Sequence, residues 1–279
     1  MRKITNETIK LFCNDLINNE RTESTVNKYF HDIREFQTWL GKEELCKGAV
    51  LVYKSWLCER YAPASVNTVL SSLNSFFNFM EWYDLRVKNL KIQKQVFSST
   101  DKELTKSEYD KLLQAAKQKK NERLYLLMQT ICSTGIRVSE VRYITVEAVC
   151  RGVADINCKG KRRQVFLAKL LCQILKRYIK EQKIKSGAVF ITKNGNPIDR
   201  SNIWSDMKKL CKAANVSDKK VFPHNLRHLF ARTYYSLQKD IVRLADILGH
   251  SSVNTTRIYT METGEIHRKQ IEKLGLLRC

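Results

Sequence analysis

The sequence predicts a mainly α-helical protein of two domains: an N-terminal helical bundle and a C-terminal mixed α/β domain with a small antiparallel sheet. The chain has 279 residues but only 10 Gly and 3 Pro, so helix breakers are few. Apolar side chains recur at helical spacing along most of it. Residues 88–103 are polar and basic and show no period. We therefore place a helical domain at 1–90, a linker at 91–103 and a second domain at 104–279.

The N-terminal domain is expected to contain four helices. Apolar stripes over residues 9–17, 26–40 and 66–80 follow the 3.6-residue period of an amphipathic helix. The last stripe follows Pro63, a residue favoured at the first position of a helix. A shorter helix over residues 50–60 joins them. Such a bundle has about the lower usual size of a domain.

The C-terminal domain combines helices with one hairpin. Thr105 and Glu108 have the spacing of a capping box that starts a helix. Two β-type runs, 153–156 and 164–167, flank a basic turn around Gly160 and predict a hairpin, and a third strand is expected near Ala188–Ile191. Further helices are expected at about 167–182, 201–213, 225–236, 240–248 and 263–274.

The charge of the chain indicates a polyanionic partner. Lys and Arg number 50 against 28 Asp and Glu, a net charge of +22. Residues 1–100 carry 14 basic and 11 acidic side chains, and the remaining residues carry 36 and 17, so the excess lies in the C-terminal domain. Binding to nucleic acid is favoured by release of counterions from phosphates. A merely soluble basic protein and an anionic membrane surface are the alternatives, but no amphipathic anchor with a basic face is present.

The cysteines and histidines indicate neither disulfides nor a metal. The nine cysteines are scattered without a C-x-x-C pair, and the five histidines add no zinc-ligand spacing. No secretory signal or long apolar run occurs, so we expect a reducing cytoplasm, with the protein associated with the nucleoid.

Two stretches suggest contacts to phosphate. In STGIRVSE, a Thr-Gly turn leads to a helix start that includes Arg137, beside free backbone N–H groups and a positive dipole end. In KGKRR, residues 159–163, a hairpin tip carries lysines that can enter a groove. Taken alone, the arginine is more often an ordinary surface residue, and the basic turn is more often simply solvated.

Two later stretches suggest proton transfer and a nucleophile. In FPHNLRH, His224 and Arg227 are three residues apart and share a helix face. In LGHSSVNTTRIYT, His250 precedes Tyr259 by nine residues, across a turn and a short Thr-rich helix. Alone, the first is more often a surface pair and the tyrosine more often a packing residue.

In order and spacing, these stretches resemble the tyrosine recombinase (phage-integrase-type) family, whose pattern is Arg, Lys, His-x-x-Arg, His or Trp, then Tyr. The matching segments read TGIRVSEV, KGKRRQVFL, HNLRH and LGHSSVNTTRIYT. The segments TVNKYFHDIREFQTWL and SVNTVLSSLNSFFNFM are similar to the core-binding (SAM-like) domain of the family. The resemblance covers nearly the whole chain, and its size is similar to that of the short two-domain Xer-like members.

The resemblance implies a reaction that needs no cofactor and no metal. Arg137 and Arg227 would hold the non-bridging oxygens of one DNA phosphate as planar forks, in the place that metal ions take in many nucleases. His250 would donate a further hydrogen bond to that phosphate. Glu140, three residues after Arg137, would orient the first arginine.

The resemblance also assigns the reacting groups. Tyr259 would attack the phosphorus and form a 3′-phosphotyrosine ester, which a second 5′-hydroxyl can reverse. A phenol keeps its proton at neutral pH, so His224 is the candidate base, and Lys159 the acid on the departing 5′-oxygen. Cys158 stands where the family has Gly, and Phe166 where it has Pro. The Phe166 departure touches the strand and not the lysine, whereas the Cys158 departure leaves open whether Lys159 or Lys161 acts, with the alignment favouring Lys159.

Binding to DNA is expected to involve both domains, closed around a duplex. Lys161, Arg162, Arg163 and Arg257 are expected to contact it, mostly at phosphates. The resemblance implies a homotetramer on two specific recombination sites, with residues 262–277 packed on a neighbour or on their own domain. The outcome would be integration, excision, inversion or resolution. The rivals are relaxation of one duplex, as by a type IB topoisomerase, and a non-catalytic DNA-binding regulator.

Overall fold

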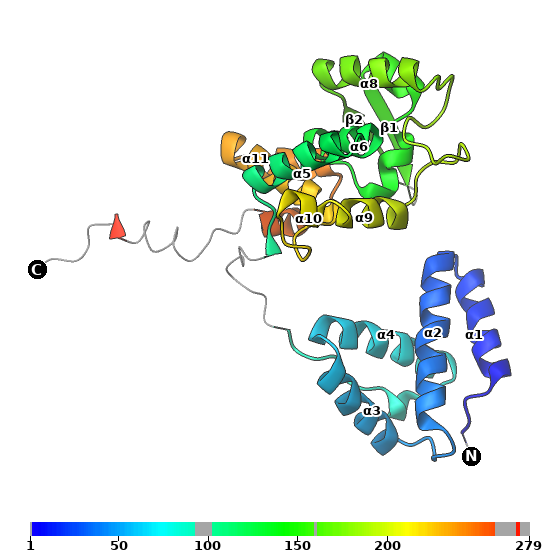
Figure 1. The fold of residues 1–279 in the computed structure, drawn as a ribbon. Coiled ribbons are helices and arrows are strands. Elements are labelled where there is room, and N and C mark those ends of the chain that lie inside the picture. The colour runs from blue at the N-terminus through cyan, green and yellow to red at the C-terminus, as the bar shows by residue number, and fades with distance from the viewer. Residues whose placement is uncertain (1, 93–101, 159–160, 260–271, 274–279) are drawn as a thin grey trace, which may run out of the picture. The chain divides into compact units, whose positions relative to one another are not determined.

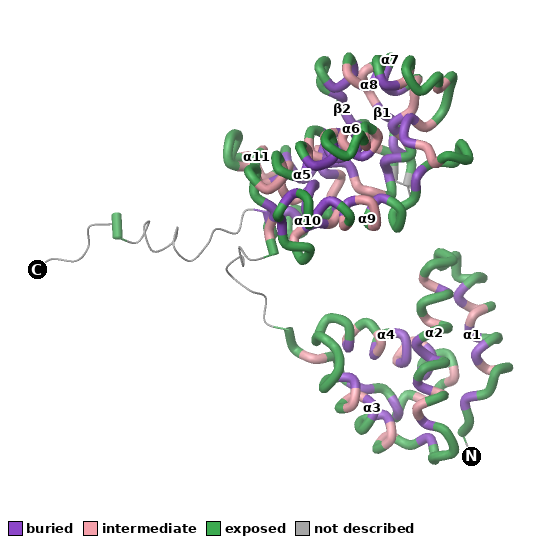
Figure 2. The backbone as a smooth tube through the Cα atoms, in the orientation of Figure 1, coloured by how far each residue is buried: buried purple, intermediate pink, exposed green. Residues whose placement is uncertain are grey.

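The computed structural model describes residues 2–92, 102–158, 161–259 and 272–273, without the side chains of Cys158 and Lys161. The chain divides into two compact units, Met1–Lys94 (unit 1) and Gln95–Cys279 (unit 2). Each unit has its own buried core (Figure 2) and is described by itself.

The described residues of unit 1 form a bundle of four helices and a short 3₁₀ turn (Figure 1), consisting of α1 (Asn6–Asn18), α2 (Glu23–Leu40), α3 (Lys47–Arg60), α4 (Pro63–Phe79) and η1 (Tyr83–Leu85). Thr5 caps α1 through a capping box with Thr8, and α4 begins at Pro63 as the sequence predicts. The predicted helical bundle is confirmed. The expected helix over 50–60 begins three residues earlier, after Cys46, whose sulfur accepts a hydrogen bond from the Ala49 amide.

The core of unit 1 is strongly aromatic. Phe12, Phe36, Phe76 and Phe77 are all fully buried or nearly so, and the rings of Phe12 and Phe76 meet edge to face at 5.4 Å. One carboxylate, Asp32, is only 4% exposed. The core therefore rests on tightly packed rings, with very little buried charge.

Unit 2 is mainly helical around one hairpin. Its elements are α5 (Lys106–Gln118), α6 (Glu122–Thr134), η3 (Val138–Tyr143), α7 (Val146–Arg151), β1 (Val153–Cys158), β2 (Lys161–Phe166), α8 (Lys169–Glu181), α9 (Arg200–Lys208), α10 (Cys211–Ala214), α11 (Pro223–Gln238), α12 (Ile241–Leu248), α13 (Val253–Thr256) and η4 (Arg257–Tyr259). Thr105 and Glu108 form the predicted capping box at α5. Helices α6 and α11 pack against each other, and their ends carry much of the site described below.

In the part of the chain that the structure describes, the sheet has two antiparallel strands, with Val153 opposite Phe166 and Cys158 opposite Lys161. The predicted third strand near Ala188–Ile191 is wrong. Within the described residues, that segment makes only isolated bridges, Thr145 to Ala188 and Ile191 to Pro197. Gly187 and Gly195 both have positive φ, so the chain turns on each side of the segment before a ladder can extend.

The helix expected over 201–213 is two helices, since α9 ends at Lys208 and α10 begins at Cys211. The helix expected over 263–274 lies outside the described residues, apart from positions 272 and 273. Among the described residues, no helix combines the length and apolarity needed to cross a bilayer.

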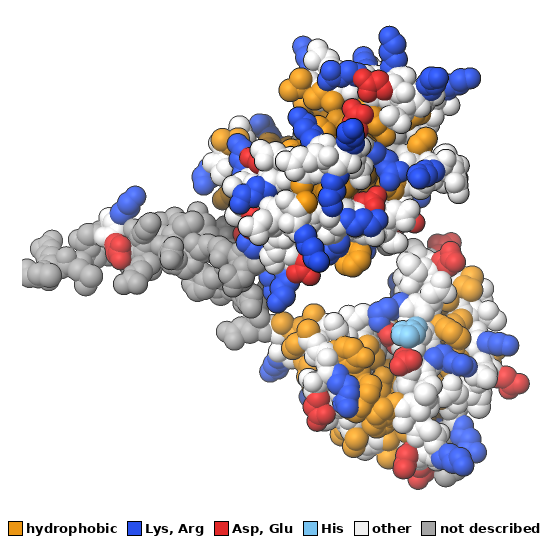
Figure 3. All heavy atoms as spheres, in the orientation of Figure 1, with side chains coloured by type: hydrophobic (Ala, Val, Ile, Leu, Met, Phe, Trp, Pro, Cys, Tyr) orange, Lys and Arg blue, Asp and Glu red, His pale blue; other side chains and the backbone are white. Residues whose placement is uncertain are grey.

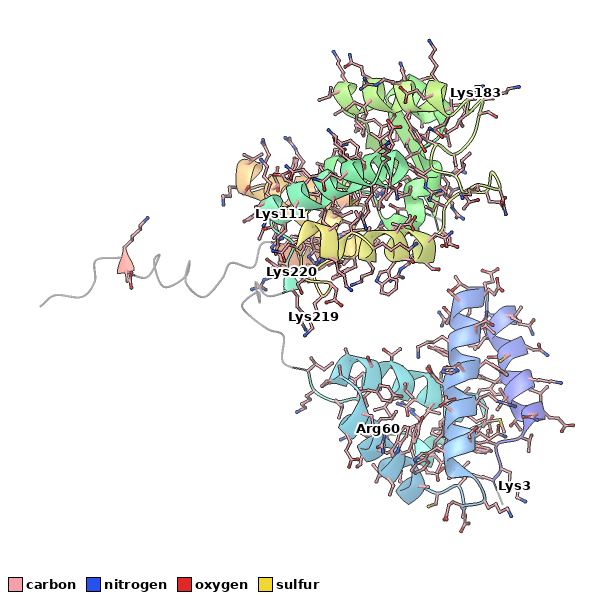
Figure 4. All side chains as sticks on the ribbon, viewed as in Figure 1. Lys3, Arg60, Lys111, Lys183, Lys219 and Lys220 are labelled. Atoms are coloured by element: carbon pink, nitrogen blue, oxygen red, sulfur yellow. The ribbon has the colours of Figure 1, made fainter. Side chains whose placement is uncertain are left out.

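Basic side chains are spread over the face of unit 2 seen in Figure 3, with fewer acidic ones among them. Figure 4 places Lys183 at the end of α8 and Lys219 and Lys220 in the turn before α11. Lys220 is paired with Glu108 at 2.9 Å and so supports the fold, while much of the remaining basic charge of unit 2 is solvent-facing.

Candidate active site

Unit 2 contains a pocket of about 520 Å³ into which five of the predicted site residues converge. They come from η3 and its start, α11, the turn after α12, and η4, four parts of the chain that lie far apart in sequence. The pocket is lined by Arg137, His224, Arg227, His250 and Tyr259, together with Arg200 and Trp204 of α9. The two arginines expected to share one phosphate therefore face the same cavity.

Arg227 is held rigidly although it carries a charge. The residue is 2% exposed, and its guanidinium donates to the carbonyl oxygens of Gly135 at 2.7 Å and Leu248 at 2.8 Å. Burial and the nearby charge of Arg137 lower its pKa to about 10, a shift that the phenol of Tyr259, a hydrogen-bond partner, partly opposes. Arg227 therefore remains a cation at neutral pH, in a fixed orientation.

Arg137 lies at the mouth of the pocket rather than inside a helix. The sequence places it at a helix start, and the structure has it directly before the 3₁₀ helix η3, as its N-terminal cap. Its amide donates to Glu140 Oε2 at 3.0 Å, and its Nη1 donates to Glu140 Oε1 at 2.9 Å. Its Nη2 donates to the Gly249 carbonyl at 3.2 Å. The side chain is nevertheless 39% exposed and accessible to a ligand.

Glu140 is a buried anion that supports the arginines. It is 2% exposed, and burial alone would raise its pKa, but the Arg137 amide and the charge of Arg163 outweigh burial and lower it. Its carboxylate therefore stays charged and binds two guanidinium groups.

His250 joins Arg227 to the helix that precedes the tyrosine. Its Nε2 lies 2.9 Å from Arg227 Nη2, and its Nδ1 lies 2.9 Å from Thr256 Oγ1. Because a guanidinium can only donate, Nε2 accepts, which places the ring proton on Nδ1. Desolvation, followed by the charges of Arg227 and Arg137, lowers the pKa of His250 to about 4. Its imidazole is thus neutral in the free protein at pH 7.

Tyr259 lies inside the pocket of its own chain. It is 4% exposed and packs with Ala231, Leu244 and Leu248. Its ring stacks on His250 with centroids 6.0 Å apart and meets His228 edge-on at 4.7 Å. The phenol is thus held between two imidazoles, next to the Arg227 guanidinium.

His224 occupies the first turn of α11, on the exposed rim of the pocket. Desolvation and then the charges of Arg227, Arg200 and Arg137 lower its pKa from its ordinary value. A neutral imidazole facing the same cavity as the phenol is in a suitable state to accept a proton.

The family of the chain follows from comparison with known sequences. Residues 102–265 match the phage integrase family, and residues 9–83 match its N-terminal SAM-like domain. The chain belongs to the phage integrase family. This result confirms the resemblance drawn from the four sequence motifs.

Named relatives of this integrase-family chain are tyrosine recombinases. It is 30% identical over 275 residues to tyrosine recombinase XerA of Pyrococcus horikoshii, with 88% of this chain and 94% of the relative covered. It is 25% identical to XerD of Vibrio cholerae, with 85% of each chain covered.

Solved structures share the integrase fold. A lambda integrase dimer bound to a COC′ core site matches with a TM-score of 0.76 and 17% identity, covering 93% of this chain and 96% of that one. XerH bound to its difH substrate matches with a TM-score of 0.71 and 20% identity, covering 95% and 84%. These likenesses confirm the predicted fold class.

The basic residues that the sequence predicts to act at the hairpin or to contact DNA lie in different environments. Lys159 lies outside the described residues, and Lys161 begins β2 with its side chain undescribed. Arg162 is exposed on β2, and Arg257 is exposed at the start of η4. Arg163, which the sequence predicts to contact DNA, has a side chain that is only 13% exposed and pairs with Glu140. It follows the inward face of β2, which it shares with buried Val165.

The sequence motifs did not predict three residues that lie in or near the integrase pocket. His228 lies four residues after His224, a spacing that puts both rings on one face of α11, so helical periodicity could have found it. Arg200 and Trp204 lie in a stretch without any motif, and no sequence signal pointed to them. Among the described residues, no group of three or more His, Cys, Asp or Glu side chains is placed to hold a metal ion.

Proposed function

We propose that this chain is a site-specific DNA recombinase that breaks and rejoins strands through a 3′-phosphotyrosine. The observation that carries the proposal is the placement of Tyr259 in one pocket with Arg137, Arg227 and His250. Its relatives XerA and XerD are named tyrosine recombinases, and XerH was solved with its difH substrate. The target is double-stranded DNA carrying specific recombination sites.

The pocket is built for an anion. Arg137, Arg200 and Arg227 line it, and the described residues of its lining include no carboxylate. Glu140 lies behind Arg137 and is already paired. A scissile phosphate would take the donors that Arg137 and Arg227 direct into the cavity, where charge developing on the non-bridging oxygens is stabilised. His250 can donate to the same phosphate once its Nε2 gains a proton.

The reaction exchanges one phosphoester for another. The Tyr259 oxygen forms a bond to phosphorus, and the bond from phosphorus to the 5′-oxygen breaks. The phenol proton passes to His224, and Lys159 supplies a proton to the departing 5′-oxygen. Attack by a 5′-hydroxyl from a second duplex reverses these steps and regenerates the phenol. The number of phosphoesters is unchanged, so no high-energy cofactor is needed.

Assembly follows the same proposal. Exchange between two duplexes requires an active site for each strand end, so we propose a homotetramer on two sites. Residues 262–277 are the proposed contact between neighbouring protomers. The protein would act in the cytoplasm, on the nucleoid.

The test uses a duplex that carries a binding site selected by this protein from random DNA, with a nick close to the scissile phosphate. Loss of the short fragment past the nick should trap the wild type as a covalent adduct, in EDTA as well as in magnesium. Tyr259→Phe should bind the duplex and form no adduct. An adduct on Tyr259→Phe, or strict dependence on magnesium, would contradict the proposal.

A second assay separates exchange from simple relaxation. A supercoiled plasmid carrying two selected sites should yield recombinant circles with the wild type. Relaxed plasmid without recombinants would instead indicate a topoisomerase, and no change in either assay would indicate a DNA-binding regulator.

A further inference from the structure

Arg163 lies on the basic hairpin, but its guanidinium contacts other elements of unit 2 and does not simply face solvent. Its Nη2 donates to Glu140 Oε2 at 2.7 Å, and its Nη1 donates to the carbonyl oxygen of Ile247 at 2.7 Å. One guanidinium thus connects β2 to the carboxylate behind Arg137 and to the end of α12. No atom of Arg163 lines the pocket itself.

Gly249 leaves the space in which Arg163 lies. A Cβ at this position would stand 2.4 Å from Arg163 Cδ and 2.8 Å from its Nε, closer than real side chains approach. Gly249 has a φ of +65°, and its carbonyl oxygen accepts from Arg137 Nη2. The turn before His250 therefore touches both Arg137 and Arg163.

Stability alone does not explain a guanidinium in this place. Its Nε is buried and has no hydrogen-bond partner among the described residues, which costs free energy. A buried ion pair is often no more stabilising than apolar side chains of the same volume. Retention of the charge is instead explained by a requirement for fixed geometry, which a planar fork supplies and an apolar side chain does not.

We propose that Arg163 is a positioning residue that fixes Arg137 for the scissile phosphate, acting through the carboxylate they share. Arg163 holds Glu140 from the side of β2, so that Oε1 and Oε2 meet the Nη1 and the amide of Arg137 in one orientation. Without Arg163, Glu140 can rotate and draw Arg137 away from the phosphate. This inference rests on the proposed strand-exchange chemistry.

The variants are Arg163→Ala, Arg137→Ala and an exposed control, Arg151→Ala. Arg151 pairs with Asp155 on the surface of the same unit and does not line the pocket. Displacement of a catalytic group by about 1 Å can slow a reaction about 10²-fold. We expect a loss of that order in the rate of adduct formation for Arg163→Ala, with nearly unchanged affinity for the duplex. Arg151→Ala should react like the wild type.

The decisive readout replaces one non-bridging oxygen of the scissile phosphate by a methyl group, in each stereoisomer separately. A methylphosphonate lacks the negative charge that Arg137 and Arg227 neutralise. The rate loss caused by a variant of either arginine should therefore be smaller on this substrate, by about tenfold or more. The rate profile of Arg163→Ala across the natural phosphate and the two stereoisomers should follow that of Arg137→Ala. A merely destabilised protein would lose the same factor on every substrate, and that outcome overturns the proposal.

A substrate with sulfur in the 5′-bridging position tests the competing path through the hairpin lysine. Sulfur leaves without a proton. If this substrate restored the rate of Arg163→Ala, Arg163 would act through the proposed acid Lys159 and not through Arg137, and the proposal would be overturned. Failure of the wild type to form an adduct on any substrate would instead refute the proposed function itself.

A further variant keeps the test independent of folding. Arg163→Lys retains the charge but lacks the fork that reaches both Glu140 and Ile247, so it should share the methylphosphonate profile at normal thermal stability. Wild-type rates for this variant would contradict the positioning role.

Discussion

The two units of the molecule differ in how they balance buried charge. In unit 1, the buried anion Asp32 accepts hydrogen bonds from Lys28 at 2.6 Å and Ser72 at 2.6 Å, so its charge is balanced locally. Unit 2 also balances its buried anion Glu140, with Arg137 and Arg163, but it buries the cation Arg227 among neutral carbonyls and an imidazole. Unit 1 balances its buried charge locally, while among the described residues of unit 2 Arg227 has no anionic partner, and the proposed function assigns its charge to a DNA phosphate.

The variant expected to have the largest effect on the reaction is Arg227→Met. Loss of one donor to a developing oxyanion slows reactions about 10²–10³-fold, and we expect at least that loss in adduct formation. Stability should change little, by no more than about 2 kcal/mol, because freeing two carbonyls and removing a buried charge have opposite effects. Nicked-duplex trapping and urea denaturation measure the two quantities. A normal rate in this variant would remove Arg227 from the mechanism.

The matching change in unit 1 is Phe76→Ala. Phe76 is fully buried and touches the rings of Phe12, Phe77 and Trp82. Its truncation should lower the free energy of unfolding of unit 1 by about 3–5 kcal/mol. The reverse pattern from Arg227→Met is expected: a large loss in stability, with any remaining folded protein still able to form the adduct. Equal effects of both variants on stability and rate would erase the contrast between the units.

The helices of both units could be predicted because burial repeats every turn. The stripe from Ile9 to Leu16 and the capping box at Thr105 are local signals, and the structure contains both. The order of the four motifs likewise pointed to the residues that the pocket brings together. The site is thus well anticipated where a motif spans a few neighbouring residues.

What escaped prediction depends on partners distant in sequence. Alternation along β2 puts Arg163 on the same face as Val165, but only the fold reveals that Glu140, 23 residues earlier, lies there to meet it. Arg200 reaches the pocket from α9 through tertiary packing alone. The strand expected at Ala188–Ile191 fails for a related reason, since its composition suits a strand but its glycine turns leave no room for a ladder.

The histidines of unit 2 should make its stability sensitive to acid. Burial lowers the pKa of His228 to about 4, with further contributions from His224 and Arg227, and desolvation brings that of His250 to about 4. In the unfolded chain a histidine titrates near 6.5. Between about pH 6.5 and pH 4 the unfolded state therefore binds more protons, so stability present above pH 6.5 is lost as pH falls.

Thermal denaturation of the DNA-free protein across this range measures the effect. His228→Asn should flatten the dependence of unit 2 on pH and lower the rate of adduct formation by loosening the Tyr259 ring that His228 contacts. If the variant lost stability with falling pH as steeply as the wild type, the pKa of His228 would not differ between the folded and unfolded states.

The smallest expected effect concerns Arg162, an exposed cation on the hairpin. Arg162 is exposed on β2, one residue from Arg163 and opposite Asn157. Removal of a residue that contacts only a phosphate weakens binding to all sequences alike and lowers the slope of log affinity against log salt by about 1. Arg162→Ala should therefore bind more weakly at low salt, with a normal rate of adduct formation once saturated. Arg163→Ala should keep the wild-type salt slope and lose rate. If both variants instead changed the salt slope, or both changed the rate, the two faces of β2 would not have separate roles in DNA binding and in positioning Arg137. The hairpin would then act as one basic surface.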